Sequence, residues 1–297
     1  MKILKRVILF GVISISSLSF SQESTHQFDY APKTEFNDAI VDSKILDYNG
    51  CTFEKIVIDG FDSKVPFYLI TPKKQKNNKY IFILHGGTSS KEDLIYPTNN
   101  LSILKDSLLL KGYSIIIPDA KYHGERSYQG NFRSPLKFFS SQDYETVNDF
   151  LFSTVKDLRI LMDYLQSKPE HSLAIFEVLG YSMGGHIAIL LNSVDDRLNH
   201  VVACIAPLDL FKLSIKLGMN EENAKKVESL SAKNNALLQK APITMFMGTE
   251  DEFYSEEEVQ AFFNDIKIKD KKLKFYNTGH FLPDEFNSDA IKYILRE

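Results

Sequence analysis

The sequence predicts an α/β protein with one mostly parallel β-sheet and helices packed on both of its faces. Short apolar runs typical of buried strands alternate along the chain with longer segments whose apolar residues recur at helical spacing. The 297 residues, 43% of them hydrophobic, suffice for one large core, and no internal repeat or second domain boundary is visible. One α/β domain is therefore expected.

Residues 1–21 have the pattern of a secretory signal peptide. Met1–Arg6 is basic, Val7–Phe20 is mostly apolar, and Ser19 and Ser21 place small residues at −3 and −1 of a cut after Ser21. A membrane anchor is the alternative, but serines interrupt a stretch that is short for a span. We expect a periplasmic or secreted protein without stable membrane insertion after cleavage.

Charge and cysteine content exclude some partners. Loss of the signal peptide would take Lys and Arg from 35 to 32 against 39 Asp and Glu, a net charge near −7 that disfavours a nucleic-acid partner. Cys51 and Cys204 are expected to be unpaired thiols, because Cys204 lies in an apolar run where cysteine behaves as a small hydrophobe. Neither has a partner at metal-binding spacing, so no metal or cofactor is expected. The oligomeric state stays open.

The elements follow in order. Residues 22–47 are polar and weakly patterned, and we expect a strap or linker ahead of a domain over 48–297. Two strands are expected to form a hairpin, Thr52–Ile58 and Val65–Ile70. Further strands are expected at Tyr80–Leu84, Tyr113–Ile117, Leu173–Val178, Val201–Ala206, Ile243–Met247 and Lys272–Tyr276. Helices are expected at Leu101–Leu110, Tyr144–Ser167, Ile187–Leu191, Leu208–Leu238, Glu256–Ile266 and Ala290–Leu295.

A serine lies at one strand-to-helix junction of this pattern. Gly180-x-Ser182-x-Gly184 matches the nucleophile elbow, a sharp turn that exposes a serine hydroxyl above the sheet. Side chains at Gly180 and Gly184 would clash with such a turn. It also places the Met183 N–H at a helix N-terminus, where negative charge is favoured.

Two candidate partners for Ser182 also follow strands, at the edge where ligands bind in parallel sheets. Asp251 follows Ile243–Met247, and His280 follows Lys272–Tyr276. His280 would take and return the serine proton, and Asp251 would fix the histidine tautomer.

Two neighbouring glutamates, Glu250 and Glu252, compete with Asp251 for the acid's role. The spacing of the acid from Gly248 favours Asp251.

These motifs, with His85-Gly86-Gly87 after the third strand and Gly279-His280, resemble the α/β-hydrolase superfamily. The dienelactone-hydrolase-like and prolyl-oligopeptidase-like serine esterases are the closer likeness, which covers about Cys51 to the C-terminus. The resemblance implies an eight-stranded sheet with an antiparallel second strand, and an oxyanion hole from the Met183 N–H and an N–H of the His85–Gly87 loop, Gly87 by position. Dienelactone hydrolases proper carry cysteine where this chain has Ser182, so dienelactone is not the expected substrate.

Other residues are expected either to line the pocket or to support the framework. Tyr122, His123, Phe253 and Phe281 are candidate substrate contacts; the first two lie in a loop, 119–127, expected to wall the pocket. His85 is expected to shape its loop, His186 to pack, and three histidines to lie in solvent, His26, His171 and His200. Residues 209–240 suggest a small cap, and a narrow, partly polar cleft between this cap and residues 119–139 would favour short acyl groups.

The expected function is hydrolysis of a carboxylic ester, small or polysaccharide-linked, through an acyl-Ser182 intermediate. A peptidase, an acyltransferase or a perhydrolase would use the same three residues. A non-catalytic binding protein of the same fold is the alternative from another class.

Overall fold

The computed structural model describes residues 27–36, 39–46, 50–73 and 78–296. The expected signal peptide, residues 1–21, lies outside these ranges, as does His26. Within them, no helix combines the length and the apolar character that a bilayer span requires.

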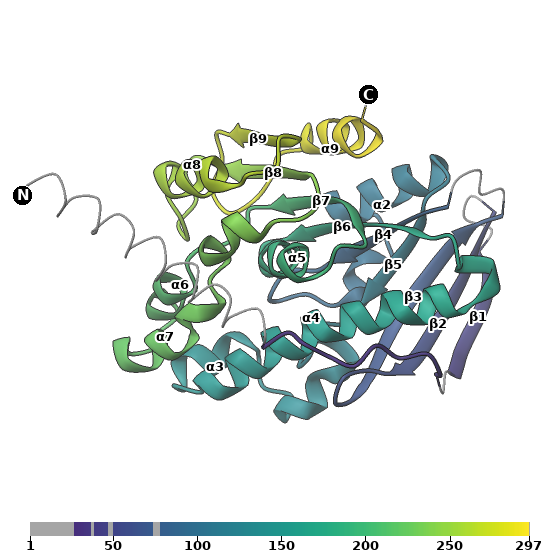
Figure 1. The fold of residues 1–297 in the computed structure, drawn as a ribbon, viewed down its shortest axis with the longest axis horizontal. Helices are drawn as coiled ribbons and strands as arrows, with labels where there is room; N and C mark the ends of the chain where they lie inside the picture. Colours follow the sequence, from purple (N-terminus) through teal and green to yellow (C-terminus); the bar gives the residue numbers. More distant parts are fainter. Residues whose placement is uncertain (1–26, 37–38, 47–49, 74–77, 297) are drawn as a thin grey trace, which may run out of the picture.

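Nine strands form one sheet in the order β1-β2-β3-β5-β4-β6-β7-β8-β9 (Figure 1). The strands are β1 (Ala39–Leu46), β2 (Cys51–Asp59), β3 (Lys64–Pro72), β4 (Lys79–Leu84), β5 (Ser114–Pro118), β6 (Ile175–Tyr181), β7 (Leu198–Cys204), β8 (Ile243–Gly248) and β9 (Lys271–Tyr276). Neighbours from β5 to β9 pair in parallel, whereas β1, β2, β3 and β5 pair antiparallel. The predicted fold class is confirmed, and β2–β9 correspond to the eight expected strands, with β3 as the antiparallel second one.

The ninth strand, β1, comes from the segment expected to be a strap or linker. It pairs with β2 at the edge of the sheet, with an irregularity in register between Ile40 and Asp42. Ahead of it, residues 27–36 run along α4 (Figure 1). Phe28 is buried against Phe152, and the Tyr30 hydroxyl donates to Asp163.

Helices cover both faces of the sheet. The helices and turns are η1 (Lys91–Leu94), α2 (Asn100–Leu110), η2 (Gly124–Gly130), α3 (Leu136–Ser140), α4 (Tyr144–Ser167), η3 (Pro169–His171), α5 (Met183–Val194), α6 (Leu210–Lys216), α7 (Glu221–Val227), η4 (Glu228–Leu230), η5 (Ala232–Leu238), α8 (Glu256–Asp265) and α9 (Phe286–Leu295). One face packs on α4, α5 and α8, and the opposite face packs on α2 and α9 (Figure 1). Side chains of β4 alternate between these two cores, Phe82 in the first and Ile81 and Ile83 in the second.

The segment between β7 and β8, residues 209–240, folds into α6, α7, η4 and η5. His186 of α5 contacts the carbonyl oxygens of Pro207 and Leu230, at 2.7 Å from Nδ1 and 2.9 Å from Nε2. Its ring is buried, and this burial lowers the pKa of His186. His186 thus packs inside the domain and holds the start of this segment close to η4.

The structure also tests the predictions made for the two cysteines and for His200. Cys51 and Cys204 are both buried and are not joined in a disulfide, as predicted. The prediction that His200 lies in solvent is wrong: it is buried in β7, with Nε2 3.0 Å from the Thr244 hydroxyl. β7 is an inner strand of the sheet and α9 packs against it, which places the His200 ring inside the domain.

Candidate active site

The turn that carries Ser182 is strained. Ser182 has φ 54° and ψ −114°, a conformation that side chains disfavour, and it caps the N-terminus of α5. A β-carbon on Gly180 would lie 2.0 Å from the Gly184 carbonyl oxygen, and one on Gly184 would lie 2.3 Å from the Leu84 carbonyl oxygen. Only glycines allow β4, β6 and α5 to approach this closely, and the approach holds Ser182 at the end of β6.

Ser182, His280 and Asp251 form one continuous chain of hydrogen bonds. The Ser182 Oγ lies 2.7 Å from His280 Nε2, and His280 Nδ1 lies 2.7 Å from Asp251 Oδ2. The other carboxylate oxygen accepts from the Phe253 N–H at 2.9 Å. Because an ionised carboxylate only accepts, the imidazole proton sits on Nδ1, and Nε2 is free to accept the serine proton.

The acidic side chain beside His280 is Asp251, not either neighbouring glutamate. The Asp251 carboxylate is fully buried, whereas Glu250 and Glu252 are exposed. Glu252 turns outward to pair with Lys216, 2.9 Å away.

One glycine brings the loops of the acid and the base together. A β-carbon on Gly248 would lie 2.4 Å from the carbonyl oxygens of both Thr278 and Gly279. The backbone after β8 therefore touches the backbone after β9, and Glu250 N–H donates to the Thr278 carbonyl at 3.0 Å. This contact brings Asp251 within hydrogen-bond distance of His280.

The Gly86–Gly87 peptide is held in one orientation. Its carbonyl accepts from His85 Nδ1 at 2.8 Å and from the Ser89 N–H at 3.1 Å. The Ala120 N–H donates to His85 Nε2 at 3.2 Å, which places the ring proton on Nδ1, and burial lowers the pKa of His85 to about 4. In a trans peptide the N–H points opposite to the C=O, so the Gly87 N–H points away from these donors. Within the described residues it has no acceptor.

The loop after β5 contacts the next peptide, Gly87–Thr88, through His123. His123 is buried, with Nε2 3.1 Å from the Gly87 carbonyl oxygen and Nδ1 2.8 Å from that of Lys121. Tyr122 has φ 64°, and its hydroxyl bonds to Asp149. The expectation that Tyr122 and His123 line the substrate pocket is therefore wrong, because neither borders the cavities at Ser182. The left-handed backbone at Tyr122 turns both side chains into the framework.

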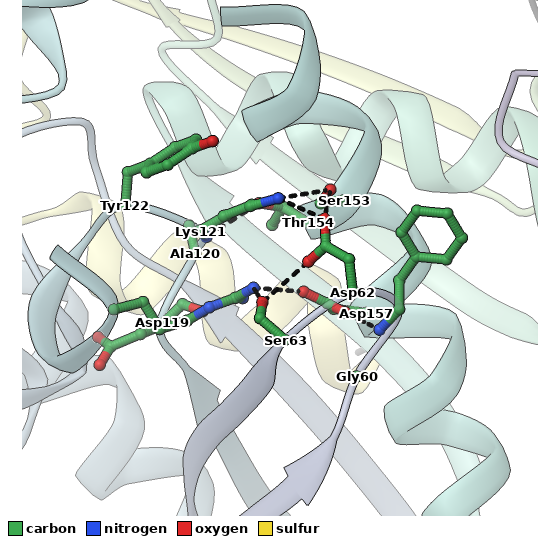
Figure 2. A network of polar contacts seen from close by, with 12 residues as sticks. Gly60, Asp62, Ser63, Asp119, Ala120, Lys121, Tyr122, Ser153, Thr154 and Asp157 are labelled. Carbon is green, nitrogen blue, oxygen red and sulfur yellow. Dashed lines mark hydrogen bonds and ion pairs between the residues drawn. The ribbon is translucent and has the colours of Figure 1, made fainter. Parts of the chain in front are cut away.

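A polar network anchors this loop to the rest of the domain (Figure 2). Arg126 is buried, 2.9 Å from Asp157 of α4, and donates to the Ser63 hydroxyl at 3.0 Å and the Asp119 carbonyl at 3.3 Å. Asp157 also accepts from the Phe61 N–H at 2.7 Å. The β2–β3 turn, the loop after β5 and α4 are thus joined at one buried ion pair.

Three carboxylates gather beside the same loop, from Glu92, Asp119 and Glu125, close enough to bind a cation together. The Lys91 ammonium group contacts all three carboxylates and is itself buried. Burial opposes its charge, yet the carboxylate of Asp119 raises the pKa of Lys91. The Lys91 ammonium thus lies among the three carboxylates, in contact with each of them, where a bound cation would otherwise sit.

Two cavities of different character meet at Ser182 and Gly87. The smaller, about 120 Å³, is bounded by Met183, Phe253 and the apolar side chains of α3, α4 and α6. The larger, about 590 Å³, is bounded by the loop after β4, the start of α2, His280 and Phe281. Phe253 and Phe281 thus lie at the site, one in each cavity.

The smaller cavity is apolar, which corrects the expectation of a partly polar cleft between the cap and residues 119–139. Its wall includes Leu136, Leu213 and Leu217, none of which is a predicted site residue. The polar residues of these segments point elsewhere; Asp209, for example, caps α6. The spacing of Leu210, Leu213 and Leu217 on one helical face is the signal that could have identified this wall.

The dienelactone hydrolase family model matches residues 65–288, about three quarters of the chain. No curated protein matches the chain by sequence.

Solved structures share the fold at low identity. Acetyl xylan esterase 1 from Thermoanaerobacterium sp. JW/SL YS485 is 18% identical with a TM-score of 0.68, over 94% of this chain and 93% of that one. An acetyl xylan esterase from Paenibacillus sp. R4 is 16% identical with a TM-score of 0.68, over 93% of each chain. An esterase from Pyrococcus furiosus is 21% identical with a TM-score of 0.55, over 90% of this chain and 94% of that one.

Proposed function

Because the chain belongs to the dienelactone hydrolase family, we propose that it is a serine esterase that cleaves short-chain carboxylic esters. The observation that carries this proposal is the chain of two 2.7 Å contacts from Ser182 through His280 to Asp251. A buried carboxylate, an oriented imidazole and a hydroxyl at a helix N-terminus are the groups that acyl transfer requires.

In the first half-reaction, Ser182 Oγ attacks the ester carbonyl carbon while its proton passes to His280 Nε2. Asp251 stabilises the imidazolium that forms. The negative charge on the carbonyl oxygen would be met by the N–H groups of Gly87 and Met183. The C–O bond to the alcohol then breaks, and His280 returns its proton to the leaving oxygen.

In the second half-reaction, water attacks the acyl-Ser182 carbonyl with His280 as the base. The acid leaves and Ser182 recovers its proton, so the enzyme is unchanged after each turnover. The reaction needs no cofactor.

The preference for short acyl groups is supported by the volume of the smaller cavity. This cavity measures about 120 Å³ against about 590 Å³ for the larger one, and apolar side chains of α3, α4 and α6 bound it. We therefore expect the best substrates to carry acyl chains from acetyl to about butyryl.

The test combines covalent labelling with kinetics. A fluorophosphonate probe should label Ser182, and Ser182→Ala should lower p-nitrophenyl acetate hydrolysis by several orders of magnitude without unfolding the protein. Ser172→Ala, an exposed serine in the turn before β6, serves as the matched control. Labelling at another residue would contradict the proposal, and absence of both labelling and hydrolysis would favour a non-catalytic protein.

We also propose that the protein is exported, on the basis of the signal-peptide pattern in residues 1–21. Expression of the full chain in a bacterial host should yield a periplasmic or secreted product that begins at Gln22. An N-terminal sequence that begins at Met1 on a membrane-bound product would instead indicate an anchor.

A further inference from the structure

The two cavities at Ser182 are not equivalent for an ester, because only one of them is bordered by His280. The leaving oxygen must receive its proton from His280 Nε2, so the alcohol must lie on the His280 side. His280 borders the larger cavity and not the smaller one. The alcohol therefore occupies the larger cavity, and the acyl chain the smaller.

The larger cavity is much bigger than a simple alcohol. It measures about 590 Å³ and opens to solvent, whereas the acyl side measures about 120 Å³. A methyl or ethyl group would leave most of it filled with water. Its size corresponds to an alcohol with many more non-hydrogen atoms than the acyl group.

The charge of this cavity argues against an anionic alcohol. Its described lining contains no lysine or arginine, and Asp284 contributes a carboxylate. A phosphate or carboxylate on the alcohol would meet that negative charge without a compensating cation.

The polar groups of the cavity are those that bind hydroxyls. Thr88 and Ser89 carry hydroxyl groups and Asp284 a carboxylate, and none of these three side chains has a hydrogen-bond partner in the part of the chain that the structure describes. Asn99 and Asn100 also border the cavity, but their side chains are used to cap α2 and to bind the Leu282 carbonyl. The free groups are therefore two hydroxyls, which donate and accept, and one carboxylate, which accepts.

An exposed aromatic ring completes this lining. The Phe281 side chain borders the cavity next to His280 and remains 59% exposed. A large exposed ring offers apolar contact area that costs little conformational entropy to use. Hydroxyl-binding groups beside an apolar ring suit a molecule with polar edges and an apolar face.

On the basis of the proposed function, we propose that the larger cavity binds a neutral polyhydroxylated alcohol, such as a sugar unit, as the leaving group of a short-chain ester. The hydroxyls of this alcohol bond to Thr88, Ser89 and Asp284, and one face packs on Phe281. In the first half-reaction the bond from the acyl carbon to the sugar oxygen breaks, the bond to Ser182 Oγ forms, and the proton on His280 goes to the sugar oxygen. The free sugar hydroxyl then leaves through the open side of the cavity.

The experiment keeps the acyl group constant and varies the alcohol. The kcat/KM values are measured for ethyl acetate, methyl 6-O-acetyl-glucoside, 1-acetylglycerol and 1-acetylglycerol 3-phosphate. We expect the acetylated glucoside to exceed ethyl acetate by about tenfold or more, and the phosphorylated glycerol ester to fall below its neutral counterpart.

Two variants test whether the larger cavity causes the preference for the glucoside ester. Asp284→Asn and Phe281→Ala should each lower the ratio of glucoside ester to ethyl ester activity by about fivefold to tenfold. Glu285→Gln, an exposed neighbour that does not border the cavity, should leave the ratio unchanged.

Equal kcat/KM for ethyl and glucoside esters would overturn the proposal while leaving the esterase intact. An unchanged ratio in both Asp284→Asn and Phe281→Ala would also overturn it. Failure of the proposed function gives a different result, because then none of the esters is hydrolysed and the fluorophosphonate probe does not label Ser182.

Discussion

The Nε2 atom of His123 lies 3.1 Å from the carbonyl oxygen of Gly87, so the loop after β5 contacts the loop after β4 directly. Burial, reinforced by the neighbouring His85, lowers the pKa of His123 to about 4, so the ring is neutral near pH 7. A neutral imidazole carries one N–H and can donate to one of its two carbonyl neighbours. With its ring in contact with the Gly87 carbonyl, we expect His123 to act as a positioning residue for the Gly87 backbone.

Replacement of His123 should impair turnover more than binding. We expect His123→Ala to lower kcat for p-nitrophenyl acetate by about tenfold with KM changed less than twofold, because the Gly87 carbonyl loses its contact with His123 and the residue that carries the Gly87 N–H is held less firmly. Steady-state kinetics test this, with His171→Ala in η3 as the control. A raised KM at unchanged kcat would instead indicate that His123 contacts the substrate.

The three acidic residues after β8 should differ sharply in their effects. Asp251→Asn should lower kcat/KM by as much as about 10⁴-fold, the order seen for this change in serine-protease triads, because the imidazole loses its preferred tautomer. Glu250→Gln and Glu252→Gln should change kcat/KM less than threefold, since both side chains are exposed. Comparable losses in Asp251→Asn and Glu252→Gln would show that the acid is misassigned.

The size of the smaller cavity should set the preferred acyl length. Along p-nitrophenyl esters from acetyl to octanoyl, kcat/KM should peak by about butyryl, because each methylene gains about 0.8 kcal/mol only while apolar wall remains. Leu217→Ala enlarges the cavity and should move the optimum one or two carbons longer, whereas Leu173→Ala, exposed before β6, should not. A kcat/KM that still climbs at octanoyl in the wild type would contradict this.

The burial of His200 should make the protein less stable in acid. Burial, reinforced by Arg296, lowers the pKa of His200 to about 4 from 6.5. Between these values the unfolded chain binds more protons, so this contribution to the free energy of unfolding is complete above pH 6.5 and is lost as the pH falls toward 4.

Urea denaturation at pH 7 and pH 4.5 tests this contribution. His200→Leu should lose about 2 kcal/mol less stability between these two values than the wild type does. Thr244→Val removes the hydroxyl beside the ring but keeps the imidazole, so it should retain the pH dependence of the wild type. An equal loss of stability between pH 7 and pH 4.5 in the wild type and in His200→Leu would show that His200 does not cause the acid sensitivity.

The buried strands and the loops that follow them could be predicted because each has a recognisable local pattern in the sequence. A parallel strand covered on two faces is a continuous apolar run, and Ser182 and Asp251 each follow such a run. His280 follows the edge strand β9, in which lysines are interspersed with apolar residues. The edge strand β1 was not predicted, because it is defined by its pairing with β2 rather than by its own pattern. The direction of the Tyr122 side chain could not be predicted from the sequence either, because it depends on a positive φ that few non-glycine residues adopt.

The buried pair of Arg126 and Asp157 joins segments that lie far apart in the sequence, since Ser63 and Phe61 bind to the same two side chains (Figure 2). The support behind Gly87 can therefore form only after the hairpin, the loop after β5 and α4 have all docked. Partly folded chains would lack it even where the turn at Ser182 had already formed. Hydrolytic activity should thus appear late in refolding, together with the last tertiary contacts and not with the first helices and strands.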